Sequence, residues 1–168
     1  MKYIFLLLVI INTTLYAKPY KVANIHKIKK AILTLKNIDN ADQLAIHIKD
    51  SSDYFKVDPR LFVILMYVES GFDNNAVSET NDISIAQISM YHWKNNPRLK
   101  KTGKFINKID KNEALAIYVM GEILSILQKD HSKDDPHWFL RYHSNTLKFK
   151  DKYFRKVKSA FLKIKGII

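Results

Sequence analysis

Cysteine is absent from this chain, and glycine is scarce, with only four residues in 168. Without cysteine the chain can form no disulfide and offers no thiol for a lipid anchor. The few glycines form no phosphate-binding loop, and Ser70 lacks the strand and turn context of a hydrolase nucleophile. Several common classes of enzyme site are therefore excluded.

Metal ligands at a recognisable spacing are also lacking. His92, His131, His137 and His143 do not fall in the pairs that hold zinc, and no cysteine can join them. We therefore expect no metal and no cofactor.

The first 17 residues have the pattern of a secretory signal peptide. Lys2 is followed by an apolar run over residues 3–11 and then by the small residue Ala17. The run is shorter than the roughly 20 residues of an ordinary membrane span, although an uncleaved anchor is an alternative. We predict a signal peptide over residues 1–17, cleaved near Ala17, and a periplasmic or secreted protein.

Acidic residues are few beside basic ones, with 16 Asp and Glu against 28 Lys and Arg and a formal net charge of +12. An excess of basic residues is typical of proteins that bind nucleic acid or an anionic envelope surface, and it can also be an ordinary solvated face. Export argues against nucleic acid as a partner. Two clusters carry much of the charge: Lys18, Lys21, Lys27, Lys29, Lys30 and Lys36, and Lys148, Lys150, Lys152, Arg155, Lys156, Lys158, Lys163 and Lys165.

Apolar residues recur at helical spacing along most of the chain, and strand patterns are scarce. Capping boxes at Asn40 and Asp110 predict two helix starts, and residues 114–127 predict a buried central helix. An apolar stripe over residues 149–164 predicts a basic C-terminal helix that packs on its own domain or lies on a membrane. With 47% hydrophobic residues, the chain can bury one core. We predict a single all-α domain and a monomer.

One predicted helix ends in a carboxylate. Asp58 is a suitable N-cap, Pro59 suits the first helical position, and Gly71 can close the helix. The residues between them are almost uniformly apolar, so we expect the helix to be buried on most sides. Glu69 is its one acid and lies in the last turn.

The position of Glu69 suits a general acid. A carboxylate at the C-terminal end of a helix meets the negative pole of the macrodipole, and apolar neighbours such as Met66 and Val68 remove water from it. Both effects favour the protonated form that a general acid needs. The alternative is that Glu69 points into solvent beyond the helix end.

The residues after Glu69 resemble the catalytic domain of soluble lytic transglycosylases, lysozyme-like enzymes that cleave peptidoglycan. The first motif of that family is Glu-Ser-x-Phe followed by Ala and Ser, and it is matched by Glu69, Ser70, Phe72, Ala76 and Ser78.

The second family motif is Gly-x-x-Gly-Leu-Met-Gln followed by an aliphatic residue. Gln87 and Ile88 match its end, but Asn81 and Ser84 replace both glycines. Asn81 tolerates a positive φ, whereas Ser84 is a less easy substitute.

The third family motif is Ala-Tyr-Asn, followed later by Tyr-x-x-x-Val. Tyr142 fits the Ala-Tyr-Asn motif and His143 departs from it. Tyr153 and Val157 match the later Tyr-x-x-x-Val. The Tyr-His-Ser version formed with Ser144 resembles that of a subfamily. The resemblance covers about residues 40–161.

The resemblance implies a lysozyme-like catalytic domain over residues 40–168 with a deep substrate cleft, preceded by a basic helical segment over residues 18–39. It implies that Glu69 protonates the bond between N-acetylmuramic acid and N-acetylglucosamine in peptidoglycan glycan strands. The same carboxylate then takes the proton of the muramic C6 hydroxyl, which closes a 1,6-anhydro ring. Ser78 and Gln87 are expected to contact sugar groups, and Tyr142 to lie close to Glu69.

Two other functions remain open on the same scaffold. A muramidase of the goose-lysozyme kind would use Glu69 with water, and a non-catalytic protein would only bind peptidoglycan. Some similar small domains open the wall for a secretion or conjugation apparatus, which would then be a partner.

Overall fold

The computed structural model describes residues 24–143 and 147–168. The predicted signal peptide with its cleavage site near Ala17, the start of the basic segment over residues 18–39, and Ser144 of the third motif lie outside the described residues. So does the side chain of Phe149, the first member of the C-terminal apolar stripe.

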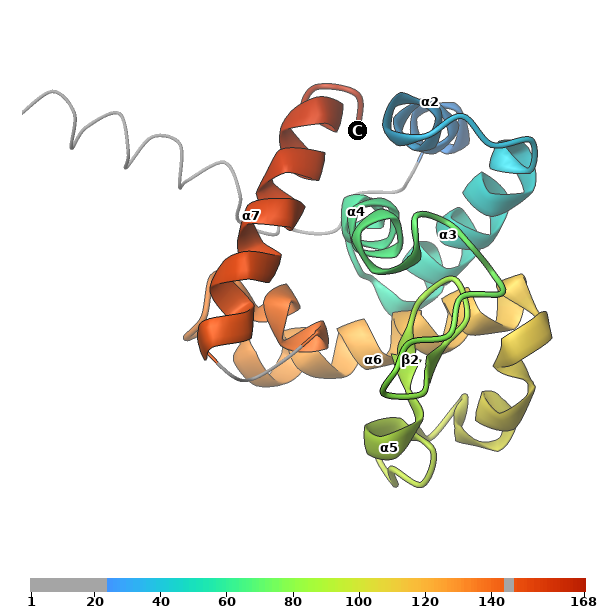
Figure 1. Ribbon diagram of the computed structural model, residues 1–168, viewed down its shortest axis with the longest axis vertical. Helices are drawn as coiled ribbons and strands as arrows, with labels where there is room; N and C mark the ends of the chain where they lie inside the picture. The colour runs from blue at the N-terminus through green and yellow to red at the C-terminus, as the bar shows by residue number, and fades with distance from the viewer. Residues whose placement is uncertain (1–23, 144–146) are drawn as a thin grey trace, which may run out of the picture.

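The described chain is mainly α, which confirms the predicted all-α class (Figure 1). Five long helices form the body of the molecule: α2 (Ile25–Leu35), α3 (Ala41–Phe55), α4 (Pro59–Ser70), α6 (Glu113–His131) and α7 (Leu147–Ile164). The shorter elements are β1 (Asp82–Ile83), β2 (Ile88–Ser89), α5 (Met90–Trp93) and the 3-10 helices η1 (Gly103–Lys111) and η2 (Trp138–Tyr142).

Helix α4 lies at the centre of the described helices. It contacts α2, α3, α6 and α7, and Figure 1 shows it nearly end-on between α7 and α3. All its residues from Leu61 to Met66 are buried, as the apolar run predicted. Asp58 accepts a hydrogen bond from the Arg60 N–H at 2.9 Å, and Gly71 ends the helix at φ +63°. These local signals were sufficient to predict the helix and its bounds.

Neither predicted capping box forms, but the helix start predicted at Asn40 is confirmed, since α3 begins at Ala41 with Asn40 as its N-cap residue. Asn40 precedes α3, but its side chain makes no capping bond and donates instead to Glu113 Oε2 at 2.8 Å. Asp110 lies inside η1, and Asn112 caps α6 by accepting from the Leu115 N–H at 3.0 Å. Asn112 thus takes the role that the spacing assigned to Asp110, whereas at Asn40 only the side-chain bond is missing.

Helices α3 and α6 approach each other closely at Gly121. A Cβ at that position would lie 2.4 Å from Ser51 Oγ and 2.5 Å from Phe55 Cδ2. The Ser51 hydroxyl donates to the carbonyl of Ile117 at 3.0 Å and so ties the two helices together. Only glycine leaves room for this crossing.

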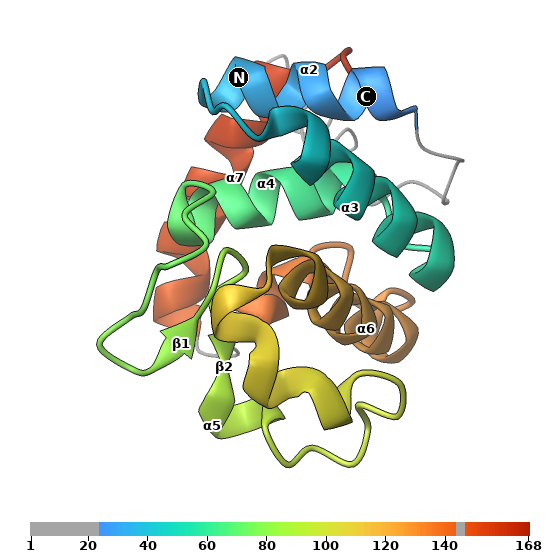
Figure 2. The ribbon, with the colours of Figure 1, turned by 90° about the vertical axis from the view of Figure 1, so that its right-hand side faces the viewer.

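The small antiparallel sheet is the pair β1 and β2, which Figure 2 shows beside α5 at one end of the molecule. The loop that leads into it begins after α4 and adds an isolated bridge between Val77 and Ile83. This loop therefore connects the end of α4, where Glu69 lies, to the sheet.

Helix α7 packs on its own domain. Tyr153, Val157, Phe161 and Ile164 are buried, and the helix contacts α2, α4 and η2. No helix in the described part of the chain is long and apolar enough to cross a membrane. The C-terminal stripe is thus part of the core.

Replacing Gly121 by alanine tests the close crossing. We expect Gly121→Ala to lower the free energy of unfolding by about 1–3 kcal/mol, because the new methyl group must push α3 and α6 apart. The measurement is urea unfolding followed by circular dichroism. Gly103→Ala is the matched control, since a Cβ there would lie an ordinary 3.4 Å from Leu99 Cβ. Equal stability of the two variants would contradict the crossing.

Candidate active site

Glu69 lies in the last turn of α4, as predicted, and its side chain is only 10% exposed. The alternative in which it extends freely into solvent is therefore not the arrangement found. A carboxylate this buried requires hydrogen-bond partners, since removing a charge from water is costly.

The principal partner of Glu69 is Tyr153 of α7. The Tyr153 hydroxyl donates to Glu69 Oε1 at 2.6 Å. Burial raises the pKa of Tyr153 well above its ordinary value, and the adjacent Glu69 charge raises it further. The hydroxyl therefore stays protonated and remains a donor to the carboxylate.

His143 forms the second side of this site. Its Nδ1 lies 3.5 Å from Glu69 Oε1, and its ring stacks on that of Tyr153 with centroids 4.3 Å apart and planes 8° apart. The residue that departs from the family motif thus lies directly beside the candidate acid.

The two oxygens of Glu69 have different surroundings. Tyr153 and His143 both approach Oε1. Within residues 24–143 and 147–168, no side chain or backbone group forms a hydrogen bond to Oε2. Among the described residues, only Oε1 thus has a hydrogen-bond partner.

Tyr142 joins η2 to the loop over residues 81–88. Its hydroxyl donates to the carbonyl of Ala86 at 2.8 Å. Burial raises the pKa of Tyr142 well above its ordinary value, and the negative charges of Glu69 and Asp82 raise it further. Tyr142 therefore shares the electrostatic environment of Glu69, and its contact with substrate stays a prediction.

The other two predicted substrate contacts hold the loop after α4. The Ser78 hydroxyl accepts hydrogen bonds from the Thr80 N–H at 3.2 Å and the Asp82 N–H at 3.0 Å. The Gln87 Nε2 donates to the carbonyls of Ala76 at 2.8 Å and Ser84 at 3.1 Å. Both side chains thus stabilise the loop in this state, and their contacts with sugar stay predictions.

The two positions where the family has glycine both adopt left-handed backbone. Asn81 has φ +63° and Ser84 has φ +73°. Ser84 is buried, and its N–H donates to the carbonyl of Ala76 at 3.0 Å. The Ser70 hydroxyl donates to the carbonyl of Ile85 at 2.6 Å and holds the loop against the end of α4. The turn is therefore formed without glycine.

A cavity of about 820 Å³ opens beside Tyr142 and His143. This volume is in the range of small-molecule binding sites. Arg98 pairs with Asp130 on its wall, and Arg141 pairs with Asp135 at 3.2 Å. The lining residues are Thr80, Asp82, Ser89, Tyr91, His92, Trp93, Asn96, Arg98, Leu127, His131, Arg141, Tyr142 and His143.

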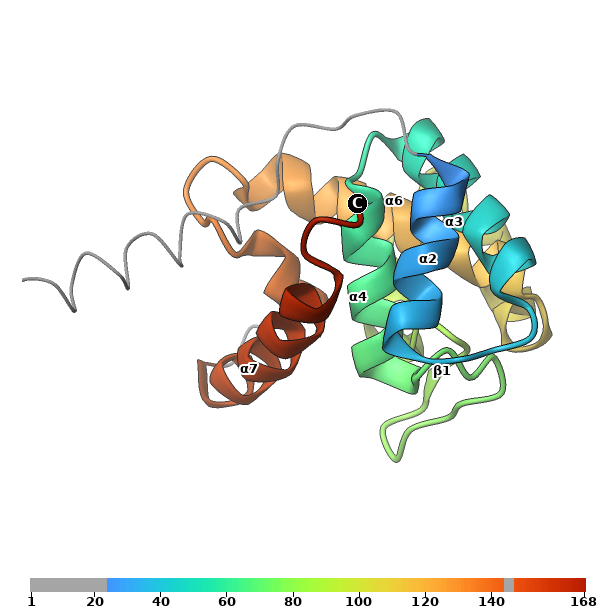
Figure 3. The same cartoon turned by 90° about the horizontal axis from the view of Figure 1, so that it is seen from above.

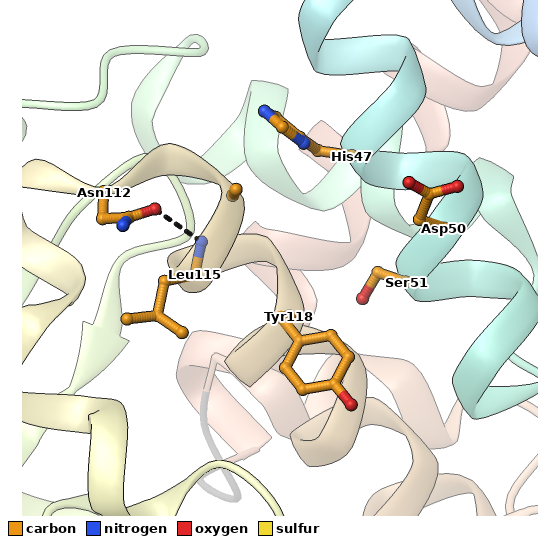
Figure 4. Close-up of a pocket in the computed structure, with 7 residues that line it drawn as sticks. His47, Asp50, Ser51, Asn112, Leu115 and Tyr118 are labelled. Carbon is orange, nitrogen blue, oxygen red and sulfur yellow. Dashed lines mark hydrogen bonds between the residues drawn. The ribbon is translucent and has the colours of Figure 1, made fainter.

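A second pocket, of about 360 Å³, lies between α3 and the start of α6. Figure 4 shows His47, Asp50 and Ser51 on one side and Leu115 and Tyr118 on the other. None of the predicted site residues lines this pocket, whereas Tyr142 lines the larger cavity, which is therefore the better candidate for the substrate side of the site.

Glu122 is another buried carboxylate, but its oxygens are occupied. It accepts hydrogen bonds from the N–H groups of Lys101 and Thr102 and from the Thr102 hydroxyl, at 2.8 to 3.2 Å. Its surroundings hold the start of η1 in place and leave no exposed oxygen for a substrate.

Histidines meet in the large cavity without making a metal cluster. His92, His131 and His143 all line it. In the described ranges, no three His, Cys, Asp or Glu side chains come together in a way that could hold a metal ion.

Tyr153 is the site residue that sequence reasoning did not identify as such. Tyr153 and Val157 match the closing Tyr-x-x-x-Val motif, which was the available signal, but the motif match did not indicate what Tyr153 does. The contact with Glu69 spans 84 residues of sequence, so no local pattern predicts it.

Backbone strain at Ser84 can be tested directly. We expect Ser84→Gly to raise the free energy of unfolding by about 0.5–1 kcal/mol, because glycine adopts positive φ without the cost that a Cβ carries. The measurement is thermal and urea unfolding. Asn81→Gly is the matched control and should change stability less, since asparagine tolerates this conformation. A destabilised Ser84→Gly variant would contradict the strain.

One of the comparisons with known proteins found a match. The family model described as Transglycosylase SLT domain matches residues 47–142, which include Glu69, Ser78, Gln87 and Tyr142. Tyr153 lies beyond the matched segment. The searches of curated proteins and of solved structures gave no match. Since the family model covers more than half of the chain, the protein belongs to the SLT transglycosylase domain family, whose members are peptidoglycan lytic transglycosylases.

Proposed function

We propose that this protein cleaves the β-1,4 bond between N-acetylmuramic acid and N-acetylglucosamine in peptidoglycan and leaves a 1,6-anhydromuramic end. One observation carries the proposal. Glu69 lies within the matched segment and resembles the acid of the family's first motif; it is nearly buried, and its Oε1 is held by Tyr153 while Oε2 makes no hydrogen bond with the described residues.

Glu69 acts twice in this reaction. The protonated carboxyl first gives its proton to the glycosidic oxygen as the bond to the anomeric carbon breaks. The muramic C6 hydroxyl then attacks that carbon, and the Glu69 carboxylate accepts the hydroxyl proton. The proton count balances and no water is consumed. Because the nucleophile belongs to the substrate, the reaction gains the advantage of intramolecular attack.

Tyr153 and His143 position the carboxyl group. The Tyr153 hydroxyl remains protonated and fixes Oε1, so Oε2 is the oxygen that exchanges the proton with substrate. The His143 ring keeps Tyr153 in place by stacking. This arrangement supports assigning the chain to a subfamily with Tyr-His-Ser in the third motif, in which histidine joins the site.

Ser78, Gln87 and Tyr142 are proposed to line the substrate side. Ser78 and Gln87 shape the loop beside Glu69, and Tyr142 lines the large cavity. The aromatic side chains of Tyr91 and Trp93 on the same cavity offer surfaces for sugar rings.

A hydrolase on the same scaffold is the second candidate, and one observation favours it. Asp82 lines the large cavity, and its charge contributes to raising the pKa of Tyr142, as that of Glu69 does. A second carboxylate near the first is what an ordinary glycosidase uses to activate water. The Asp82 carboxylate accepts a hydrogen bond from the Thr80 hydroxyl at 2.9 Å, which favours a structural role in the loop.

We place the protein in the periplasm or outside the cell, on the signal-like pattern of residues 1–17. The net charge of +12 supports attraction to the anionic wall. We propose that the protein is a monomer and that its partner is the glycan strands of peptidoglycan. Opening the wall for a secretion or conjugation apparatus is a role that a small domain of this kind can serve.

Removing the acid tests the catalytic assignment. We expect Glu69→Gln to fold normally and to release soluble fragments from purified peptidoglycan at least about 100-fold more slowly, because general acid and base catalysis contributes about 10²–10⁴. The measurement is the rate of fragment release. Glu79→Gln, at an exposed acid in the following loop, is the matched control and should keep full activity. A well-folded Glu69→Gln variant with retained activity would rule out the assignment.

Removing only the Tyr153 hydroxyl tests the positioning role. We expect Tyr153→Phe to lower kcat by about 10- to 100-fold, since a hydrogen bond to a charged group contributes about 1.5–3 kcal/mol. KM should change little, because Tyr153 is not proposed to bind sugar. Tyr54→Phe, on α3, controls for loss of a tyrosine hydroxyl elsewhere. An unchanged kcat in Tyr153→Phe would show that the 2.6 Å contact does not serve the reaction.

A further inference from the structure

A basic groove lies between the end of α4 and α7, apart from the large cavity. Its volume is about 470 Å³, and Figures 1 and 3 both show α7 next to α4 and crossing it instead of running parallel to it. The lining residues are Tyr67, Val68, Arg155, Lys156, Ser159, Ala160 and Lys163. We refer to this set as the α4–α7 groove.

The groove is positively charged and has no internal counter-charge. Arg155, Lys156 and Lys163 line it, and no Asp or Glu does. With the residues that the structure describes, these three cations form no salt bridge; Lys163 lies over the Tyr67 ring at 5.8 Å from its centroid. Three cations that line one groove set up a local positive potential, which attracts an anion.

Residues of the α4–α7 groove neighbour the candidate acid in the sequence, but Glu69 itself is not among the described residues that line the groove. Val68 directly precedes Glu69, and Tyr153, which binds Glu69, lies one turn before Lys156 on α7. At a rise of 1.5 Å per residue, Lys156 and Lys163 lie roughly 5 and 15 Å along the helix from Tyr153. The cations thus form a row that leads away from the carboxyl group.

We propose that the α4–α7 groove binds the carboxylates of the stem peptide carried by the sugar at Glu69. This rests on the proposed function, since it takes peptidoglycan as the substrate. An extended peptide of four residues reaches up to about 14 Å, which matches the length of the cationic row. Its carboxylates would accept charge-assisted hydrogen bonds from the arginine and lysines.

The chemistry of the groove favours a peptide over a bare polyanion. Tyr67, Val68 and Ala160 supply apolar surface, and Ser159 supplies a hydroxyl. A stem peptide combines short apolar side chains with free carboxylates, whereas a nucleic acid would use only the charges. The groove would therefore make the enzyme prefer glycan strands that still carry stem peptides.

The test compares two pairs of charge reversals in the full chain, each made on the Glu69→Gln background so that substrate is not cleaved. Lys156→Glu with Lys163→Glu removes the charge of the groove. Lys108→Glu with Lys111→Glu makes the same charge change on exposed residues of η1 and is the matched control. Circular dichroism and thermal unfolding verify that each protein is folded.

Binding is measured by co-sedimentation with two insoluble peptidoglycan preparations, one intact and one stripped of stem peptides by an amidase. We expect the groove variant to bind intact peptidoglycan about tenfold more weakly than its parent, and stripped glycan equally well. The control variant should match the parent on both. Free stem peptide should compete with binding of the parent to intact peptidoglycan, and the same peptide with amidated carboxyls should not.

Three outcomes would overturn the proposal: an equal loss on stripped glycan, an equal loss in the control variant, or competition by a DNA oligonucleotide at the same charge concentration as the peptide. The last would indicate a general polyanion surface. Binding is measured without cleavage, so the two proposals can fail separately. If the Glu69→Gln parent binds through the groove as expected but the wild-type protein does not cleave peptidoglycan, the proposed reaction is contradicted and the assignment of the groove stands.

Discussion

The site depends on one hydrogen bond between two helices, from the Tyr153 hydroxyl to Glu69 Oε1 at 2.6 Å. It gives a nearly buried carboxylate a donor that stays protonated, and it joins the last turn of α4 to α7. Tyr153 keeps its place because Val157, Phe161 and Ile164 continue its buried stripe into the core. The packing of the C-terminal helix is therefore a condition of the chemistry and not a separate structural element.

The loop after α4 depends on the same end of the helix. Ser70 holds the loop by its bond to the Ile85 carbonyl, and Tyr142 holds it from the other side by its bond to the Ala86 carbonyl. Directly before these two anchored residues, Ser84 adopts a positive φ that a serine would avoid if the chain were free. The loop thus tolerates the loss of two family glycines because hydrogen bonds from α4 and η2 fix its course.

Sequence alone predicted the features that local signals determine. The bounds of α4 and the place of Glu69 followed from Asp58, Pro59 and Gly71, which act within a few residues of the helix ends. The helix start predicted at Asn40 was right although its side-chain cap did not form, and the start predicted at Asp110 was wrong because Asn112 caps α6. The Tyr153 contact and the α4–α7 groove required the docking of α7, which no local pattern contains.

The central claim is that Glu69 drives intramolecular attack by the muramic C6 hydroxyl. Mass spectrometry of the soluble muropeptides that the protein releases from purified peptidoglycan tests it most directly, because the two chemistries differ by one water in the product. The account predicts anhydromuropeptides. Products with reducing muramic ends, heavier by one water, would contradict it and identify a hydrolase on the same scaffold.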